Sequence, residues 1–329
     1  MRLNPSSQGG RLAGSGRGAC RAALHRCIHD RLREDPTILQ TFTVPAVPRC
    51  LTRPRRWPVA LLVGLALSLS VVLKVQATTT WTVCASGCDY SSIKAAIAAP
   101  TTLDGDTLAI AAGTYSEAGI AVNKSLTLQG EDVATTIVQA ATSSGTAPDR
   151  VFTIPSGVHV NLRELTIRYG HVNNSGGGLS NLGTLTLAHS TVSGNIAAEG
   201  GGLSNEGTLT LTQSTVRGNR AAWGGGLSNL GTLAVTNSIV ASQSDGGDCR
   251  HAGSWAVHTH GYNLDTDGSC QLTAPTDRPS TDPRLGPLQD NGGPTLTHAL
   301  LPGSPALDVI PWGTNGCGTT LVSDQRWQA

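Results

Sequence analysis

Acidic and imidazole side chains concentrate between residues 245 and 270. The group comprises Asp245, Asp248, His251, His258, His260, Asp265 and Asp267. Within it, Asp265-Thr266-Asp267-Gly268 is similar to the start of a calcium loop, because Ca²⁺ prefers carboxylate oxygens on a sharply turned chain. The later ligands of an EF-hand are missing. Calcium held by Asp265 and Asp267 is therefore the one cofactor that the sequence suggests. A polar excursion without any metal is the alternative.

Two other features of the chain could bind a ligand. His258-x-His260 would place both imidazoles on one face of a strand, where they could hold a metal. Trp223 occupies a repeat position where earlier copies have Ser175 and Glu199, so its ring should be exposed. An exposed indole could stack on a sugar ring and bind carbohydrate. A shielded packing contact with the neighbouring alanines is the alternative for Trp223.

The repeated part of the chain has too few acidic residues to predict catalysis by carboxylates. Glycoside hydrolases need paired carboxylates, and calcium-dependent lyases need clustered carboxylates with a base. The repeats offer only Glu199 and Glu206, whose counterparts one repeat away are not acidic. Arg217 and Arg220 should face solvent near a turn, and His298 should be a buried, hydrogen-bonded residue that pins the terminal cap. No residue is predicted to be catalytic.

A repeat of 24 residues must position these side chains. Residues 176–199, 200–223 and 224–247 all begin with Gly-Gly-Gly-Leu-Ser-Asn, and a fixed period in the twenties indicates a solenoid. Thr184–Leu187 and Thr208–Leu211 alternate polar and apolar residues, as a half-buried strand does. We therefore predict an all-β fold, a single-stranded right-handed parallel β-helix in which each repeat forms one coil.

Stacking of equivalent positions predicts both the core and the turns. Leu185, Leu209 and Leu233 should form one apolar column inside the solenoid. Asparagine should form ladders at the turns, because it tolerates left-handed backbone and its amide can bond to the amide above it. The positions expected in these ladders are Asn181, Asn205 and Asn229 in one column and Asn195 and Asn219 in another.

The ends of the solenoid need their own stabilisation. Residues 90–97 form the one plausible helix, short and amphipathic, and should cap the N-terminal end. Cysteines of an exported protein pair by default, which predicts the disulfides Cys84–Cys88 and Cys249–Cys270 and leaves Cys317 over. A zinc site at the first pair is disfavoured because no second ligand pair lies nearby.

Charge divides the chain at about residue 78. Twelve of the 23 Lys and Arg residues but only three of the 22 Asp and Glu residues come before it, so the remainder carries a net charge of −8. An acidic remainder argues against nucleic acid as a partner, since nucleic-acid binding needs basic patches. Arginines at 53–56, an apolar run over 59–73 and small residues up to Ala77 predict a signal peptide over 53–77. An uncleaved membrane anchor is the alternative.

The predicted organisation has four parts. Residues 1–52 are either a disordered extension or a stretch wrongly included in the reading frame, with the true start at Val44 or Val47. The signal segment follows over 53–77. The β-helix occupies 78–248, and disulfide-stapled C-terminal coils with a cap occupy 249–329.

Three stretches carry a resemblance to a known group of proteins. Cys84–Tyr90, continued by residues 111–117 and 125–130, resembles the opening of secreted bacterial right-handed β-helix proteins of the pectate-lyase-like superfamily. The glycine-rich coils resemble polymorphic-outer-membrane-type repeats, and the tail over 261–308 is similar to the choice-of-anchor Q group. The resemblance implies an exported bacterial β-helix, often attached to a cell surface, and no particular reaction. Related chains continue beyond the point where this one ends, so a truncation or a frameshift is an expectation that leaves surface attachment open.

Three functions remain open at this stage, because fold alone does not choose among them. The first is a non-catalytic exported cell-surface or extracellular protein, adhesin-like or carbohydrate-binding. We expect such a protein to be a monomer whose partner is a polysaccharide or a surface protein. The second is a polysaccharide lyase or glycoside hydrolase acting on uronic-acid-containing polymers. The third is a protein-interaction scaffold.

Overall fold

The computed structural model describes residues 78–317 except 132–134, 242 and 254, and the structural statements below concern these residues. The expected N-terminal extension over 1–52 and the expected signal segment over 53–77 lie outside them. Within the described part, no helix is long and apolar enough to cross a membrane.

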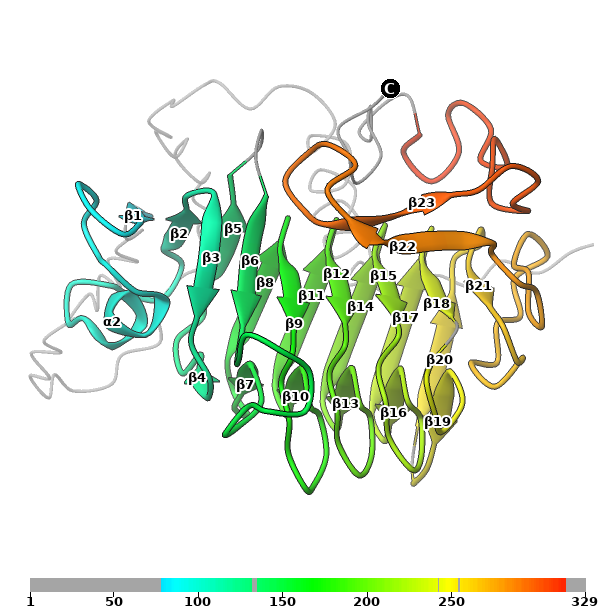
Figure 1. Ribbon diagram of the computed structural model, residues 1–329, viewed down its shortest axis with the longest axis horizontal. Helices are drawn as coiled ribbons and strands as arrows, with labels where there is room; N and C mark the ends of the chain where they lie inside the picture. Colours follow the sequence, from blue (N-terminus) through cyan, green and yellow to red (C-terminus); the bar gives the residue numbers. More distant parts are fainter. Residues whose placement is uncertain (1–77, 132–134, 242, 254, 318–329) are drawn as a thin grey trace, which may run out of the picture. The chain divides into compact units, whose positions relative to one another are not determined.

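Three parallel sheets, here named A, B and C, build the solenoid, and the chain visits them in turn (Figure 1). Sheet A contains β1 (Thr80–Val83), β2 (Thr107–Ile110), β5 (Thr127–Gly130), β8 (His159–Arg163), β11 (Thr184–Ala188), β14 (Thr208–Thr212), β17 (Thr232–Thr236) and β20 (Ala256–Thr259). Sheet B contains β3 (Gly113–Ser116), β6 (Thr136–Gln139), β9 (Thr166–Arg168), β12 (Thr191–Ser193), β15 (Thr215–Arg217), β18 (Ile239–Ala241) and β21 (Leu264–Asp265). Sheet C contains β4 (Ile120–Ala121), β7 (Phe152–Ile154), β10 (Leu179–Asn181), β13 (Leu203–Asn205), β16 (Leu227–Asn229) and β19 (Cys249–His251).

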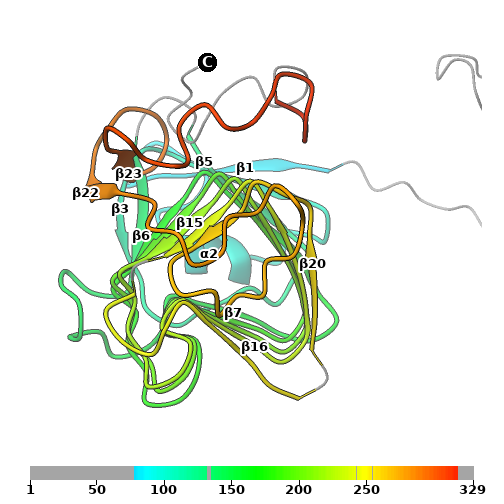
Figure 2. The same cartoon turned by 90° about the vertical axis from the view of Figure 1, so that its right-hand side faces the viewer.

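The coils wind in a right-handed sense. In Figure 2 the C-terminal end of the solenoid faces the viewer, and the chain passes from sheet A at the right to sheet B at the upper left and sheet C below as it advances. This is the hand that parallel strands joined by crossovers almost always adopt. The predicted right-handed parallel β-helix is confirmed. The three sheets also run on without a break from β16–β18 to β19–β21, across residue 248.

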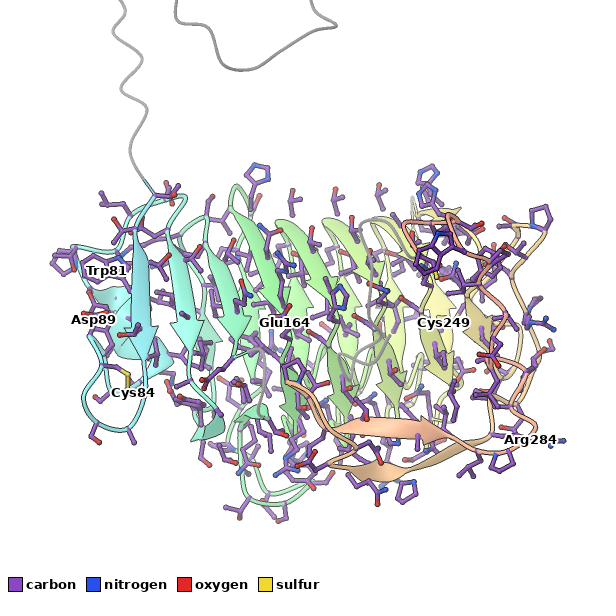
Figure 3. All side chains as sticks on the ribbon, turned by 90° about the horizontal axis from the view of Figure 1, so that it is seen from above. Trp81, Cys84, Asp89, Glu164, Cys249 and Arg284 are labelled. Atoms are coloured by element: carbon purple, nitrogen blue, oxygen red, sulfur yellow. A yellow bond between two sulfur atoms is a disulfide. The ribbon has the colours of Figure 1, made fainter. Side chains whose placement is uncertain are left out.

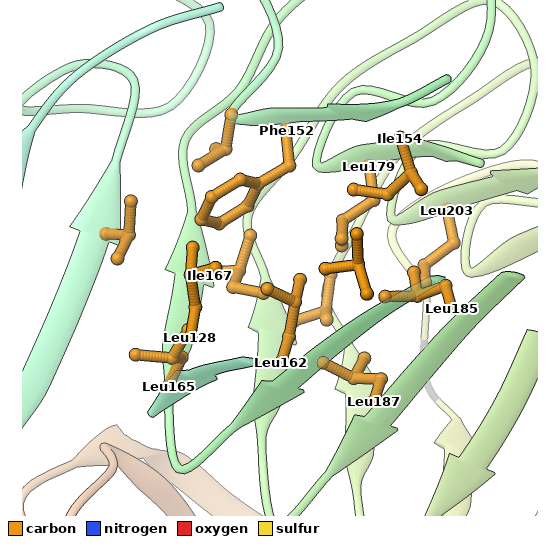
Figure 4. Close-up of a cluster of buried hydrophobic side chains, with 14 of the residues drawn as sticks. Leu128, Phe152, Ile154, Leu162, Leu165, Ile167, Leu179, Leu185, Leu187 and Leu203 are labelled. Carbon is orange, nitrogen blue, oxygen red and sulfur yellow. The ribbon is translucent and has the colours of Figure 1, made fainter. Parts of the chain in front are cut away.

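The apolar columns form the core as expected. Leu185 pairs in register with Leu209, and Leu209 with Leu233, and all three are at most 1% exposed. Figure 4 shows the same stacking one coil earlier, where Phe152 and Leu162 converge with side chains from all three sheets. A single coil could bury none of these residues, so the favourable free energy of removing apolar surface from water is gained only when coils stack.

The asparagine ladders are confirmed in full. Asn181 Nδ2 donates to Asn205 Oδ1 at 2.7 Å, and Asn205 Nδ2 donates to Asn229 Oδ1 at 2.7 Å. The second ladder joins Asn195 Nδ2 to Asn219 Oδ1 at 2.9 Å. These side chains are at most 1% exposed, so each amide depends on its neighbours for its hydrogen bonds.

A third ladder, made of serine side chains, was not predicted from the sequence. The backbone N–H of Ser190 donates to Ser214 Oγ, that of Ser214 to Ser238 Oγ and that of Ser238 to Asn263 Oδ1, at 3.0–3.2 Å. The serines recur every 24 residues, but serine is common in turns and its spacing alone does not show that it is buried.

Helix α2 (Ile93–Ala98) covers the N-terminal end of the solenoid, as predicted. It begins later than expected because Ser92 is the N-cap, with its Oγ accepting from Ala95 N at 3.1 Å. The Glu117 carboxylate accepts two further N–H groups of the first turn, from Ile93 at 2.8 Å and Lys94 at 3.0 Å.

Both predicted disulfides, Cys84–Cys88 and Cys249–Cys270, are present. Figure 3 places Cys84 near the N-terminal end of the solenoid and Cys249 near the C-terminal end. Cys317 is not part of a disulfide. The second bridge joins β19 to the loop after β21, so it holds the last coil closed.

An antiparallel hairpin of β22 (Leu285–Gln289) and β23 (Thr297–Leu300) returns along the outside of sheet B (Figure 1). Leu296 N donates to Thr166 Oγ1 at 2.8 Å, and Thr136 N donates to Pro294 O at 2.9 Å. The hairpin therefore lies over strands that precede it by more than 100 residues, and it covers sheet B rather than extending the solenoid.

Replacing a ladder asparagine should destabilise the whole solenoid. Asn205→Ala leaves Asn181 Nδ2 and Asn229 Oδ1 without their ladder partners in a dry interior, which should lower the free energy of unfolding by about 2–4 kcal/mol. Denaturant unfolding followed by circular dichroism measures the change. The exposed Asn173→Ala is the matched control and should stay within about 0.5 kcal/mol of wild type. Equal midpoints for the two variants would contradict the role of the ladder.

Candidate functional site

Three aspartates from two turns meet beside the Cys249–Cys270 disulfide. Asp248 immediately precedes β19, Asp265 ends β21 and Asp267 follows it. Carboxylate oxygens from the three residues all lie within 4.8 Å of one another. Oxygens bound to one Ca²⁺ lie about 2.3–2.6 Å from the ion, hence no more than about 5 Å apart. The spacing of this aspartate trio therefore fits one calcium ion.

Backbone amides hold the trio in place. Asp265, fully buried, accepts from Cys270 N at 2.9 Å and Ser280 N at 3.1 Å. Asp248 accepts from the backbone and the hydroxyl of Thr266, and Asp267 Oδ2 accepts from Asp248 N at 3.0 Å. A carboxylate oxygen that accepts one N–H keeps a lone pair for a metal. The exposed Asp267 would be the side from which an ion enters.

Burial sets the electrostatics of the trio. Desolvation raises the pKa of Asp248 and of Asp265, and the neighbouring carboxylates raise both further. Burial also acts to raise the pKa of Asp267, but hydrogen bonds from Ser269 and from Asp248 N outweigh it, so the pKa of Asp267 is lowered. Two buried carboxyls with raised pKa values beside a third carboxylate make the trio a candidate site for a cation, whose charge would favour the ionised form of all three.

Sequence reasoning named Asp265 and Asp267 as the calcium ligands, and the structure adds Asp248. Asp248 lies beside Cys249, and the disulfide brings it to the 265–267 loop. The predicted pairing of Cys249 with Cys270 was thus the signal that could have identified it. His258 and His260 are both exposed, and within the described residues they belong to no group of three potential metal ligands.

Trp223 projects from the turns between sheets B and C, with 60% of its surface exposed. Its neighbour in the turn ladder is Glu199, and that of Glu199 is Ser175, as the repeat predicted. The Arg250 guanidinium carbon lies 5.8 Å from the centre of the indole ring, and Arg250 Nη1 is ion-paired with Glu199 Oε2. We refer to Trp223, Arg250 and Glu199 as the Trp223 platform.

The platform exists because the repeat changes at this point. Arg250 in β19 pairs with Ser228 in β16, and Ser228 pairs with Ser204 in β13. Both serines are buried, whereas the long Arg250 side chain reaches back to the turns that carry Trp223 and Glu199. Arg250 is also only two residues from Asp248, so the platform and the aspartate trio each contribute a residue at the start of β19.

The prediction that Arg217 faces solvent is wrong. The C-terminal hairpin covers it, and its guanidinium contacts the Gly286 carbonyl and lies 3.0 Å from His298 Nδ1. Burial lowers the pKa of Arg217. Nothing in the repeat reveals that Gly286 and His298, which are 69 and 81 residues later, return to sheet B. Arg220, in contrast, is exposed as expected, with its Nε 3.8 Å from Asp245 Oδ2.

His298 joins the hairpin to sheet B through Arg217, as predicted, although its side chain is half-buried rather than buried. Its Nδ1 lies 2.9 Å from the Gly286 carbonyl, an acceptor, and 3.0 Å from Arg217 Nη1, a donor. Burial lowers the pKa of His298, and the adjacent Arg217 charge lowers it as well, while the Gly286 hydrogen bond acts against both. The ring is therefore neutral at pH 7.

Comparison with known proteins adds no family. No family model and no curated protein matches the chain. Among solved structures, a pectin methylesterase from Aspergillus niger is similar over 62% of this chain and 90% of its own, at 14% identity and a TM-score of 0.33. A pectin methylesterase in complex with a hexasaccharide is similar over 65% of this chain and 72% of its own, at 14% identity and a TM-score of 0.34. The β-helix assignment rests on the strand pairing described above.

Calcium should stabilise the fold through the aspartate trio. At a hundredfold excess over its dissociation constant, the ion contributes about 2.7 kcal/mol, which raises the melting temperature by roughly 5–10 °C in a domain of this size. Melting curves with calcium and with EDTA measure the shift. Asp267→Asn should abolish it, and the exposed Asp290→Asn should keep it. A wild-type protein that melts at one temperature in both buffers would contradict the site.

The hairpin contact should weaken in mild acid. The pKa of His298 is lower in the folded than in the unfolded chain, so its contribution to stability is present above about pH 6.5 and is lost as pH falls toward the folded pKa. The stability difference between wild type and His298→Gln should therefore shrink between neutral pH and pH 5. Denaturant unfolding at a series of pH values measures it, and parallel profiles for the two proteins would contradict the assignment.

Proposed function

We propose that this chain is an exported, extracellular or cell-surface β-helix protein that binds carbohydrate on the Trp223 platform without turning it over. The observation that carries the proposal is the indole of Trp223, 60% exposed and placed beside the Arg250–Glu199 ion pair. In the described regular coils, the other large apolar side chains are buried or half-buried except Leu182, which is 42% exposed and has no charged pair beside it. An apolar ring kept in water at the edge of a rigid solenoid is suited to a partner that covers it.

The chemistry of the platform suits a sugar. The face of the indole can pack against the C–H groups of a pyranose ring, while the guanidinium donates to hydroxyl or carboxylate oxygens and the Glu199 carboxylate accepts from hydroxyls. The ion pair holds both charged groups beside the ring before any ligand arrives. That preorganisation reduces the entropy lost on binding.

Calcium would act on the platform indirectly. The trio residue Asp248 and the platform residue Arg250 flank Cys249 at the start of β19. An ion bound by the trio would fix this short strand, and with it the base of the Arg250 side chain. Carbohydrate binding should therefore be stronger with calcium than with EDTA. The two disulfides, which persist in oxidising compartments, support export.

A calcium-dependent lyase acting on uronic-acid polymers is the second candidate, and the aspartate trio is the observation that favours it. Asp248 and Asp265 are at most 2% exposed, so within the described residues the trio can hold an ion more readily than it can touch a polymer. The binding proposal therefore fits the geometry better than the lyase does.

Removing the indole should remove binding. On a glycan array and in titrations with the best array hit, Trp223→Ala should weaken affinity at least about tenfold, or 1.4 kcal/mol. Trp312→Ala removes a tryptophan that is 80% exposed elsewhere and should bind like wild type. Equal affinity of Trp223→Ala and wild type would exclude the platform. A calcium-supplemented activity screen on pectins distinguishes the lyase from the binding protein. Turnover that is lost in Asp265→Asn or Asp267→Asn would establish a lyase.

A further inference from the structure

The outward face of sheet A carries a regular field of threonines on three consecutive coils. The threonine field consists of Thr184 and Thr186 in β11, Thr208, Thr210 and Thr212 in β14, and Thr232 and Thr236 in β17. The residues that alternate with them, such as Leu209 and Leu211, are at most 2% exposed. The threonines therefore project away from the core, into solvent.

Strand pairing places these threonines on a two-dimensional lattice. Thr184, Thr208 and Thr232 pair in register across the three strands, Thr186 pairs with Thr210, and Thr212 pairs with Thr236. Parallel strands lie about 4.8 Å apart, and alternate residues of one strand are about 6.6 Å apart. Because threonine is branched at Cβ, its side chain is stiff, so the hydroxyls and methyls repeat at both spacings.

The field is uncharged and lacks anchors. Its remaining outward positions are Ala188 and Ala234. Charged and imidazole side chains lie only around it, with Arg163 in β8, His258 in β20, and Glu206 and His189 in the turns that border β14 and β11. Protein interfaces are anchored by aromatic and arginine side chains, which the field does not offer. A polyelectrolyte would find no charge to pair with here.

Within the described part of the chain, the C-terminal segment reaches only the border of the threonine field, where Asn315 Nδ2 donates to Asn237 Oδ1 at 3.1 Å. The C-terminal hairpin lies on sheet B, and Figure 2 shows sheet A free of it on the other side of the solenoid. The field is also separate from the Trp223 platform, which belongs to the turns between sheets B and C.

An uncharged, regularly spaced array of side chains is complementary to a crystal surface whose atoms repeat at the same spacings. The rows of oxygen atoms at the surface of ice recur at spacings close to those between strands and between alternate residues of a strand. A threonine hydroxyl can occupy a lattice-water position while its methyl fills the space between rows. We propose that sheet A binds the surface of ice crystals through the threonine field.

Ice partition tests the proposal on the full chain. Slow growth of an ice front from a dilute solution should enrich the wild-type protein in the ice, and the protein should keep crystals small during recrystallisation. Binding by a neutral face should change little with salt, unlike an ionic contact. A wild-type protein that is excluded from ice like serum albumin overturns the proposal.

Thr210 lies at the centre of the field and provides the decisive variant. Thr210→Lys puts a long charged side chain on the face without touching the core, and enrichment should fall to the level of the excluded protein. Thr114→Lys makes the same change at an exposed position of sheet B and should keep full enrichment. Circular dichroism confirms that both variants fold. Equal enrichment of Thr210→Lys and wild type also overturns the proposal. Trp223→Ala should enter the ice like wild type, whether or not it still binds carbohydrate.

Discussion

Buried amide stacking is the constraint on which this structure depends. Within a ladder, each asparagine amide donates to the equivalent residue 24 positions later, so that Asn205 both receives from Asn181 and donates to Asn229. A buried amide without these partners costs more than the hydrogen bond contributes, so the coils that carry a ladder must share one length and one register. The apolar columns and the strand pairing follow from that register, and so does the even spacing of the threonine field.

The candidate site occurs where the repetition ends. Gln243 takes the place of an asparagine at the end of the second ladder, with its Oε1 3.3 Å from Asn219 Nδ2. One coil further, Arg250 replaces the buried serines of sheet C and pairs with Glu199. The last coil therefore keeps the backbone geometry of the solenoid, while its side chains differ from those of the repeat and can bind a ligand. The second disulfide and the aspartate trio hold this coil closed.

The sequence predicts contacts between repeated coils well, and it predicts contacts made by segments outside the repeat poorly. The Leu185 column and the Asn181 and Asn195 ladders follow from periodicity, because equivalent positions of identical coils stack on one another. The capping helix follows from the amphipathic pattern of residues 90–97. Asp248 and Arg250 could not be placed, since their partners are set by how the last coil closes. The burial of Arg217 was missed for a similar reason: the hairpin that covers it belongs to no repeat.

Adding coils tests the central claim most directly. Insertion of three further copies of residues 200–223 after residue 223 extends every column and ladder by three identical members. If coils stack in register, solution scattering should show a particle about 14 Å longer with an unchanged cross-section, and the melting temperature should stay the same or rise. A wider cross-section, or loss of cooperative melting, would contradict the stacking on which the account rests.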